Sequence, residues 1–416
     1  MNEVSTSAMR PAHVSGQSVF DFDMYLDPEL LADPHARLSR MLRDAPPVFW
    51  TPRNGGHWVA LRHQEVFAAS RDWENFSNEH GAMTGAEIMR ERAQRPPGVK
   101  HAPQAVPITM DPPEHGKYRA PLVSPFGPKA IKALAEDIRA LANSLIDRVL
   151  DQGRCDFIPS VAEPLPVQVF LKMMGLPLER QGEFRDLVHA FLAPGGSDPA
   201  VIARRYRMVA DAIDDALLAG KDKPAGDLIS MLWAAQIEGE PMSLELMEDY
   251  GVLLFIAGLD TVINAMGYGV RHLAANPDLQ QQLRETPALI PEAVEELLRR
   301  YSFVITLRRV AREVELGGCT LMPGERIMLC LPTADIDPDQ FPDPERFDLG
   351  RENKTHIAFG AGPHRCLGSH LARLELQVLY TEWLRRVPPF RLDPDGQVRF
   401  HAGSIIAIDS LPLRWD

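Results

Sequence analysis

Ten residues near the C-terminal end, Phe359 to Gly368, constrain the fold of this chain more than any other stretch. Their sequence, FGAGPHRCLG, contains three glycines and a proline, which predict a tight loop whose backbone can run close to a flat ligand. From Ser369 to Arg386 apolar residues recur with helical spacing. Cys366 therefore lies where a helix is expected to begin, and free N–H groups and the helix dipole favour an anionic sulfur there.

A thiolate in this place can serve as a nucleophile, a zinc ligand or the axial ligand of a haem iron. A structural zinc site is disfavoured because Cys155, Cys319 and Cys330 lie outside metal-ligand spacing. His364 could act as the base of a nucleophilic cysteine, but the glycine spacing matches no cysteine hydrolase signature known to us. For a lone cysteine, the plainest alternative is a buried side chain at the start of a helix.

Length and charge limit the class of protein. The chain has 416 residues, 45% of them hydrophobic, and no long Gly/Ser or charged linker. We therefore expect a flexible tail, residues 1–21, followed by a single domain, residues 22–416. The net charge of −13 argues against nucleic acid as a partner, because phosphate binding needs a basic surface. We expect a monomer.

Cysteine usage and hydropathy indicate a cytoplasmic protein. The four cysteines form no disulfide framework, which is typical of a reducing compartment. The first 20 residues are polar, and no uncharged apolar run reaches about 18 residues. We therefore expect neither a signal peptide nor a membrane span.

The longest helical pattern runs from Ser243 to Ala275 and ends at Asn276-Pro277. A helix of that length would span roughly 50 Å, enough to cross a whole domain. Its centre, Ala257 to Thr261, places a glycine, an aspartate and a threonine among apolar neighbours, although all three are poor helix formers. We interpret this centre as a functional break, rather than as an exposed polar patch.

The remaining pattern predicts a mostly helical fold with small β-sheets. Further helices are expected at Met24–Arg43, Gln64–Arg71, Lys129–Gln152, Pro166–Met174, Gln181–Leu192, Pro199–Leu218, Asp227–Gln236 and Pro291–Tyr301. Strands are expected near residues 47–50, 57–61, 304–310, 313–316, 326–330 and 398–413. The irregular segment from Gly81 to Met110 is a candidate lid, since loops of that length are commonly functional.

Three motifs occur in a fixed order along the chain. They are Ala257-Gly258-x-Asp260-Thr261, then Glu296-x-x-Arg299, then Phe359-x-x-Gly362-x-x-x-Cys366-x-Gly368, and the run FPDPERF stands at residues 341–347. Together they resemble the bacterial class I cytochromes P450. The longer phrases GLDTV at residues 258–262 and CLGSHLAR at residues 366–373 are most similar to the camphor hydroxylase family and its terpenoid-hydroxylating relatives.

This resemblance implies the cytochrome P450 fold, a helical prism in which haem b lies between the long central helix and the Cys-bearing loop. Cys366 would be the axial ligand of the haem iron. The residues that match the family's partners for the haem propionates are His115, Arg119, Arg308 and His364. Arg308 is preferred over Arg309 because the two adjacent side chains should point to opposite faces of a strand.

The same resemblance assigns roles to four further residues. Thr261 would hydrogen-bond oxygen at the iron, and Asp260 would relay protons from solvent. Camphor hydroxylase holds this Asp with two basic residues; Arg185 matches one of them, whereas Ala193 stands at the other position. Glu296 and Arg299, which are three residues apart and can pair, would be structural and act with Arg346.

The expected activity is insertion of one oxygen atom from O2 into a C–H bond of a small apolar molecule, a terpenoid or norisoprenoid. The expected electron donors are a [2Fe-2S] ferredoxin and its FAD-dependent reductase, as separate proteins, because the sequence contains no flavin or iron–sulfur segment. A peroxide-driven P450 and a non-catalytic haem-thiolate binding protein are the alternatives. The intact Asp260-Thr261 pair disfavours both.

The expected pocket differs from that of camphor hydroxylase. Pro103 stands where that enzyme has a substrate-orienting Tyr, and Ala82 stands where it has a closing Phe. The other expected wall residues are all aliphatic: Leu253, Ile256, Val304, Ile305, Ile405 and Ile406. A roomier apolar wall predicts a substrate bulkier than camphor.

Overall fold

The computed structural model describes residues 7–79, 94–95, 100–192, 199–222 and 225–416. Its helices are α1 (Pro28–Ala32), α2 (Pro34–Asp44), α3 (His63–Arg71), α5 (Glu114–Val123), α6 (Pro128–Lys132), α7 (Ala135–Leu150), α8 (Pro164–Met173), α9 (Gln181–Leu192), α10 (Pro199–Asp222), α11 (Leu228–Trp233), α12 (Leu244–Gly258), α13 (Asp260–Ala275), α14 (Pro277–Glu285), α15 (Ile290–Arg300), α16 (Leu331–Ala334) and α17 (Ser369–Arg386). Helices dominate, as predicted.

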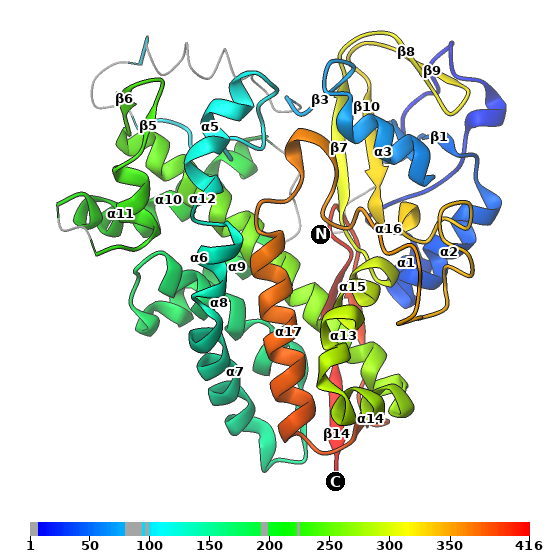
Figure 1. Ribbon diagram of the computed structural model, residues 1–416. Helices are drawn as coiled ribbons and strands as arrows, with labels where there is room; N and C mark the ends of the chain where they lie inside the picture. The colour runs from blue at the N-terminus through cyan, green and yellow to red at the C-terminus, as the bar shows by residue number, and fades with distance from the viewer. Residues whose placement is uncertain (1–6, 80–93, 96–99, 193–198, 223–224) are drawn as a thin grey trace.

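The strands are short. They are β1 (Val48–Thr51), β2 (His57–Ala60), β3 (Phe76–Ser77), β4 (Arg154–Asp156), β5 (Gln236–Ile237), β6 (Glu240–Pro241), β7 (Ile305–Val310), β8 (Val314–Leu316), β9 (Cys319–Leu321), β10 (Arg326–Cys330), β11 (Phe390–Leu392), β12 (Arg399–His401), β13 (Ala407–Ser410) and β14 (Pro412–Trp415). The largest sheet has the order β1-β2-β10-β7-β3. Figure 1 shows this sheet on one side of the molecule, helices α5 to α12 on the other, and α13 and α17 between them.

The two central helices pack closely enough to need a glycine. Tyr380 on α17 donates a hydrogen bond to the carbonyl of Ala265 on α13 at 2.9 Å. A Cβ atom on Gly269 would lie only 1.9 Å from the Tyr380 hydroxyl. Any larger residue at position 269 would therefore push α17, and the loop that precedes it, away from α13.

The long central segment is two helices rather than one continuous helix. The segment changes direction at Leu259, between α12 and α13, and the N–H of Ile263 reaches back to the Leu259 carbonyl at 3.4 Å. The break predicted within residues 257–261 is thus confirmed as an interruption between α12 and α13. By length and composition alone, residues 244–275 could cross a membrane, but 78% of their most apolar window is buried inside the fold, as in a core helix.

Two expected helices differ from those observed, and some observed elements were not expected. The helix predicted from Met24 to Arg43 is split into α1 and α2, because Asp27 and Asp33 each cap a new helix that begins with a proline. The helix predicted over residues 129–152 is split into α6 and α7. Helix α14 and strand β9 were not predicted.

Part of the expected tail packs against the domain. Val14 is 1% exposed, and the N–H of Phe20 donates to the carbonyl of Trp50 in β1 at 3.1 Å. Residues 7–21 therefore contact the domain, and only residues 1–6 of the expected tail lie outside the described part of the chain. The division of the chain into a tail and one domain stays a prediction.

Candidate functional site

The Cys366 loop lies at the N-terminal end of α17, where it was predicted. The N–H of Cys366 donates to the carbonyl of Phe359 at 2.8 Å, which closes the loop on itself. Gly362 has a φ of 71°, and a Cβ atom there would lie 2.5 Å from the Ser70 carbonyl oxygen. Glycine is therefore required where the loop passes the end of α3. In Figure 1 this loop, in orange, lies above α17 and beside β7.

Cys366 is the exposed one of the four free cysteines. Its thiol nevertheless has many protein atoms around it, and burial raises the pKa of Cys366. The N–H of Gly368 and the charges of Arg119, Arg373 and Arg365 act in the opposite direction. The Gly368 N–H at the helix start thus lowers this pKa, as expected, but desolvation is the larger effect and the net shift of the free thiol is upward.

Three of the predicted propionate partners lie together at the Cys366 loop. The rings of His115, from α5, and His364, from the loop, have centroids 4.2 Å apart. Arg119, one helical turn after His115, donates from Nη2 to the carbonyl of Arg365 at 2.5 Å. The structure therefore brings His115, Arg119 and His364 to one place, although Arg119 and Arg365 are 246 residues apart in the sequence.

Two buried basic groups near this place lack the usual partners. His115 is 3% exposed, and within the described residues its Nε2 atom has no hydrogen-bond partner. Burial, with the charge of Arg119, lowers the pKa of His115 to about 4. Arg308, in β7 and 7% exposed, forms no ion pair among the described residues; its Nη1 atom donates to the Leu307 carbonyl at 2.8 Å, and burial lowers its pKa to about 10. Buried basic groups without an anionic partner are costly, which indicates a site for an anion.

The break between α12 and α13 contains the second predicted constellation. Thr261 is half-buried and its hydroxyl donates to the carbonyl of Ala257 at 3.0 Å. Ala257 is exposed and Gly258 half-buried, in the middle of a segment that is otherwise mostly buried. A Cβ atom on Gly258 would meet no atom within 4 Å. This turn of helix therefore faces open space, as a ligand site requires.

Asp260 is 7% exposed at the first position of α13. Its Oδ1 atom accepts from Asn264 Nδ2 at 3.1 Å, whereas Oδ2 is buried without a hydrogen-bond partner among the described residues. Burial raises the pKa of Asp260, and the charge of His401 and the hydrogen bond from Asn264 lower it. A carboxyl with a raised pKa can carry a proton closer to neutral pH.

Arg185 does not hold Asp260, contrary to the expectation drawn from the resemblance. Its Nε atom instead donates to Glu163 Oε1 at 2.9 Å. The charges that act on Asp260 come from His401 and Asp409 on the C-terminal strands. Ala193, the other position compared, lies outside the described residues.

Glu296 and Arg299 form the predicted structural pair. Both Oε atoms of Glu296 accept hydrogen bonds from Arg299 at 2.8 Å, and the two side chains are at most 1% exposed. The third partner is Arg351 rather than Arg346, since Arg351 Nε donates to Glu296 at 3.0 Å. Arg346 contributes only its backbone carbonyl. The pair thus fastens the segment before the Cys366 loop to α15.

Arg299→Leu should lower the free energy of unfolding by about 3–5 kcal/mol, because it leaves the Glu296 carboxylate buried with one cation in place of two. Urea unfolding of the haem-bound protein measures this loss. The matched control is Arg385→Leu, which removes another Arg three residues from a glutamate, Glu382, but from a side chain that is 63% exposed. That control should cost less than about 1 kcal/mol. Equal losses in the two variants would contradict the structural role of the buried pair.

The predicted wall residues separate into two groups. Val304 and Ile405 form a β-bridge and are half-buried, and Leu253 and Ile256 on α12 are also half-buried. Ile305 and Ile406, by contrast, are 4% and 1% exposed within the main hydrophobic core. Pro103 is buried, and Ala82 lies outside the described residues. The candidate wall is therefore Leu253, Ile256, Val304 and Ile405.

Sequence reasoning missed a buried charge network that holds residues 100–104 on α12. His101 contacts Glu248 at 2.9 Å and Asp249 at 3.1 Å, and the N–H of Gln104 also donates to Asp249. Burial lowers the pKa of His101, but the two carboxylates have the larger combined effect and raise that pKa to about 9. The signal that could have been used is the adjacent Glu248-Asp249 pair inside an otherwise apolar helix.

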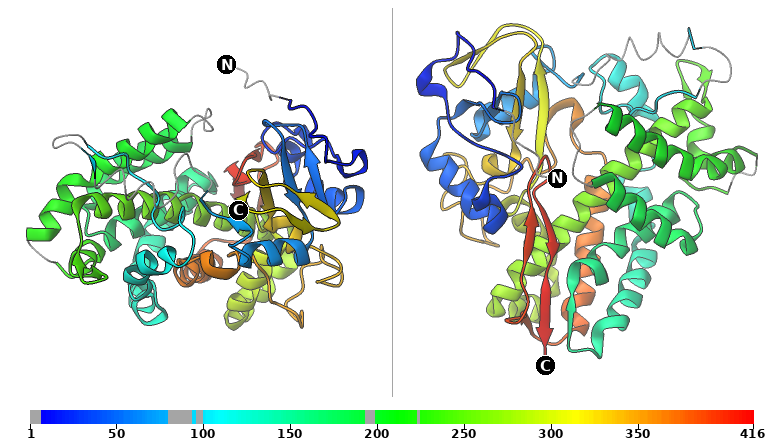
Figure 2. Two further views of the ribbon diagram at one scale, coloured as in Figure 1. Left: turned by 90° about the horizontal axis from the view of Figure 1, so that it is seen from above. Right: turned by 180° about the vertical axis from the view of Figure 1, so that it is seen from behind.

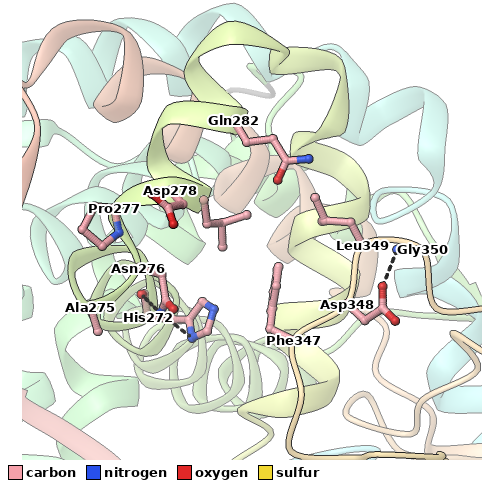
Figure 3. Close-up of a pocket in the computed structure, with 11 residues that line it drawn as sticks. His272, Ala275, Asn276, Pro277, Asp278, Gln282, Phe347, Asp348, Leu349 and Gly350 are labelled. Carbon is pink, nitrogen blue, oxygen red and sulfur yellow. Dashed lines mark hydrogen bonds between the residues drawn. The ribbon is translucent and has the colours of Figure 1, made fainter.

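A surface hollow of about 690 Å³ lies elsewhere, between the α13–α14 junction and residues 347–350 (Figure 3). It is lined by His272, Asn276, Asp278 and Gln282 and by the backbone near Asp348, none of which carries a predicted role. The Nδ1 atom of His272 is hydrogen-bonded to the Tyr301 hydroxyl at 2.8 Å. Burial lowers the pKa of His272 to about 4. The hollow is thus separate from the Cys366 site.

Comparison with known proteins decides the family. The family model described as Cytochrome P450 matches residues 288–402. The protein called "Probable cytochrome P450 127A1" from Sinorhizobium fredii is 34% identical over 418 residues, which cover 97% of this chain and 96% of that protein. The chain is a cytochrome P450. Steroid C26-monooxygenase of Mycobacterium tuberculosis is 33% identical over 93% of the chain and 95% of its own length. Linalool 8-monooxygenase of Pseudomonas putida is 29% identical over 86% of this chain and 90% of its own length.

Solved structures agree with this assignment. CYP101C1 matches this P450 with a TM-score of 0.87 and 32% identity, over 98% of this chain and 100% of the other. CYP101J2 matches with a TM-score of 0.86 and 33% identity over the same shares. The resemblance drawn from the sequence motifs is confirmed, and so is the predicted fold class.

Cytochromes P450 bind haem b, and the residues present fit that group. An exposed thiol at Cys366 lies within reach of the charges of Arg119 and Arg365, and the basic groups of His115 and Arg308 are buried without an anion. No other cluster of His, Cys, Asp and Glu within the described residues could hold a metal ion. Haem b would satisfy both features, because its iron can take a thiolate ligand and its propionates are anions for the buried basic groups.

Proposed function

We propose that this P450 inserts one atom of O2 into a C–H bond of a terpenoid or norisoprenoid, with electrons from a ferredoxin and its reductase. The observation that carries the proposal is the break at Leu259. There Asp260 and Thr261 stand beside an exposed turn of an otherwise buried helix. This combination supports a proton-delivery site, because a buried acid without a full set of partners is otherwise costly.

We assign the haem to the Cys366 loop, with Cys366 as the axial ligand. The bound haem supplies the iron at which O2 is reduced. Arg308, His115, Arg119 and His364 would hold its propionates, and the buried His115 and Arg308 side chains would then gain an anionic partner. Closure of the Cys366 loop by the hydrogen bond to Phe359 fixes the sulfur in place.

Asp260 and Thr261 would handle protons at the break between α12 and α13. The Thr261 hydroxyl, held by the Ala257 carbonyl, places a hydrogen-bonding group at the exposed turn of the helix. Asp260 keeps Oδ2 unpaired, so this atom can take a proton and pass it on. Phe255 and Val262, on either side of the break, are buried and apolar, so they would limit the access of bulk water to Asp260.

The wall supports an apolar substrate larger than camphor. Leu253, Ile256, Val304 and Ile405 offer no hydrogen-bond donor, and Pro103 stands where camphor hydroxylase has its Tyr. Affinity should therefore follow buried apolar area, at about 25 cal/mol per Å². Two relatives are named for linalool and for a steroid, which supports an apolar substrate class.

Titration of the ferric protein with camphor, linalool and β-ionone should produce a low- to high-spin shift, with tighter binding of β-ionone than of camphor. Val304→Phe places a larger side chain in the wall of the pocket and should raise the dissociation constant of β-ionone by roughly tenfold, because the added ring takes space that the bulkier ligand needs. The affinity for the smaller camphor should change less. Val123→Phe, the same change at a valine that is 53% exposed, is the control and should change nothing. The substrate proposal fails if camphor binds as tightly as β-ionone and Val304→Phe leaves that order unchanged.

The electron donors and the location stay part of the proposal. Oxygen-dependent consumption of NADH in the presence of a ferredoxin and its reductase, exceeding the turnover with peroxide alone, would support the ferredoxin-dependent enzyme. Turnover with peroxide alone would instead support the peroxide-driven alternative. We keep the cytoplasmic location, the monomeric state and the absence of a membrane or nucleic-acid partner as expectations.

A further inference from the structure

The C-terminal hairpin β12–β13 is fixed against the start of α13. Asn264 donates from Nδ2 to Asp260 Oδ1 at 3.1 Å and accepts, through Oδ1, from the N–H of Ile408 at 2.8 Å. The Tyr268 hydroxyl donates to the carbonyl of Ile406 at 2.9 Å. In Figure 2 the red C-terminal strands run along α13. These buried bonds hold the Asp260 carboxyl and the hairpin in a defined relation.

The same hairpin carries an exposed ionisable pair. His401 on β12 contacts Asp409 on β13 through Nδ1 and Oδ1 at 2.6 Å. The two side chains are 44% and 42% exposed, so solvent reaches both. Asp260, in contrast, is 7% exposed and has its Oδ2 atom unpaired within the described residues. The hairpin that is hydrogen-bonded to Asn264, the partner of the buried Asp260 carboxyl, therefore carries a solvent-accessible acid–base pair.

Few other charged groups face Asp260 in the described part of the chain. The charges that act on its carboxyl are His401 from β12 and Asp409 from β13. Segment Ile158–Ala162, which packs on α13, contains no charged residue. The phenol of Tyr268, one turn beyond Asn264, is fully buried, and burial raises its pKa. Arg271 lies over the ring of Phe400 rather than beside Asp260.

Asp409 and Asp260 in turn change the pKa of His401. The hydrogen bond to Asp409 raises the pKa of His401, and the charge of Asp260 adds to the rise. The imidazolium in turn lowers the pKa of Asp260. Such an interaction between two titrating groups is reciprocal.

We propose that the His401–Asp409 pair is the charge partner of Asp260, in the role that the resemblance gave to Arg185, and that it makes proton delivery to the haem pocket depend on pH. His401 acts here as a positioning residue, since it works through Asp260. The inference rests on the proposed role of Asp260. Unlike an arginine, an imidazole loses its charge near neutral pH, so the protein gains a sensitivity that a permanent cation would not give.

The direction of the pH effect follows from the charges. While His401 is protonated, its positive charge favours the Asp260 carboxylate, which then exchanges its proton readily. When the pH rises through the pKa of His401, the imidazole becomes neutral and Asp260 binds its proton more tightly. Release of the proton toward the pocket then slows, and more of the consumed NADH should yield hydrogen peroxide.

Titration of His401 by NMR in the reduced, carbon monoxide-bound holoenzyme tests the charge coupling without turnover. Comparison with His401→Gln identifies the resonance. Asp260→Asn should lower the titration midpoint of His401 by roughly half a pH unit, which corresponds to about threefold in proton affinity. His13, paired with Glu325 at 3.1 Å and 31% exposed, is the matched control, and its midpoint should not move. An unchanged His401 midpoint in Asp260→Asn would overturn the proposal.

Turnover with linalool as the probe, or with β-ionone if linalool gives no spin shift, tests the functional half. In the wild type the product formed per NADH should fall by roughly threefold as the pH rises through the His401 midpoint. His401→Lys should keep the low-pH ratio across that range, and His401→Gln should give a flat, low ratio; His13→Gln should follow the wild type. A wild-type profile retained in His401→Gln overturns the proposal. Asp260→Asn with normal turnover would instead refute the role of Asp260 itself, while the NMR shift would still report the coupling.

Discussion

Cys366→Ala should abolish the absorbance band at the wavelength typical of thiolate-ligated haem when the variant is reduced and exposed to carbon monoxide. The thiol has no substitute nearby, because Cys319 and Cys330 are buried in other parts of the fold. The variant should also lose monooxygenase turnover completely. Absorbance spectra of the dithionite-reduced, carbon monoxide-saturated protein measure the first effect, and NADH-driven oxygen consumption the second.

Cys366→His separates ligand identity from haem binding. An imidazole can bind the iron, so this variant should retain haem while its carbon monoxide band moves to the shorter wavelength of a nitrogen-ligated haem. Cys155→Ser is the matched control, since burial raises the pKa of that thiol to about 12 and leaves it protonated. Its spectrum should equal that of the wild type. A normal thiolate band in Cys366→Ala would show that another group holds the iron.

Local sequence pattern was sufficient where the structure depends on nearby residues. Helix α17 spans Ser369 to Arg386 as predicted, because its apolar spacing is unbroken and the glycine-rich loop ends just before it. The break near Gly258 could be anticipated because poor helix formers stand among apolar residues. The choice of Arg308 over Arg309 followed from strand alternation, and Arg308 is the more buried of the two.

Pairs of side chains that are distant in sequence could not be predicted from the apolar periodicity of helices or strands. Arg351 rather than Arg346 binds Glu296, because the irregular segment between them has no repeat that fixes which side chain turns inward. Arg185 was assigned by analogy with a relative, but Glu163, twenty-two residues earlier, lies closer and captures it. The free energy that selects such pairs comes from tertiary packing and desolvation, which neither spacing nor composition encodes.

Burial also reversed one electrostatic expectation. The helix start was expected to lower the pKa of Cys366, yet desolvation raises the pKa of the free thiol. The sequence predicted the contribution of the helix start but not the larger contribution of desolvation. An iron ion that binds the sulfur adds a positive charge far larger than a helix dipole, and a coordinating thiol is deprotonated outright.

Thr261→Ala should divert electrons to hydrogen peroxide while substrate binding stays near that of the wild type. The methyl side chain removes the hydroxyl now held by the Ala257 carbonyl, and with it the group that we propose steadies oxygen during proton delivery. The product formed per NADH should fall by about tenfold or more, whereas NADH consumption continues. Product, peroxide and NADH, measured in the same reaction, give this ratio.

Thr261→Ser is the conservative control. It keeps a hydroxyl within reach of the Ala257 carbonyl and should restore most of the coupling, which a loss of packing alone would not explain. A drop in coupling equal to that of Thr261→Ala would mean that the methyl group of Thr261 matters rather than its hydroxyl.

Asp260→Asn should have the complementary effect, a turnover lower by about 10²-fold with less peroxide than Thr261→Ala gives. Asparagine preserves the shape of the side chain and its contact with Asn264 but cannot release a proton, so delivery rather than oxygen binding becomes slow. Because proton transfer then limits the rate, the solvent deuterium isotope effect on turnover should rise in Asp260→Asn and stay near the wild-type value in Thr261→Ser. Normal rates and normal coupling in both Thr261→Ala and Asp260→Asn would remove the proton-delivery mechanism, even if the Cys366 spectrum were as expected.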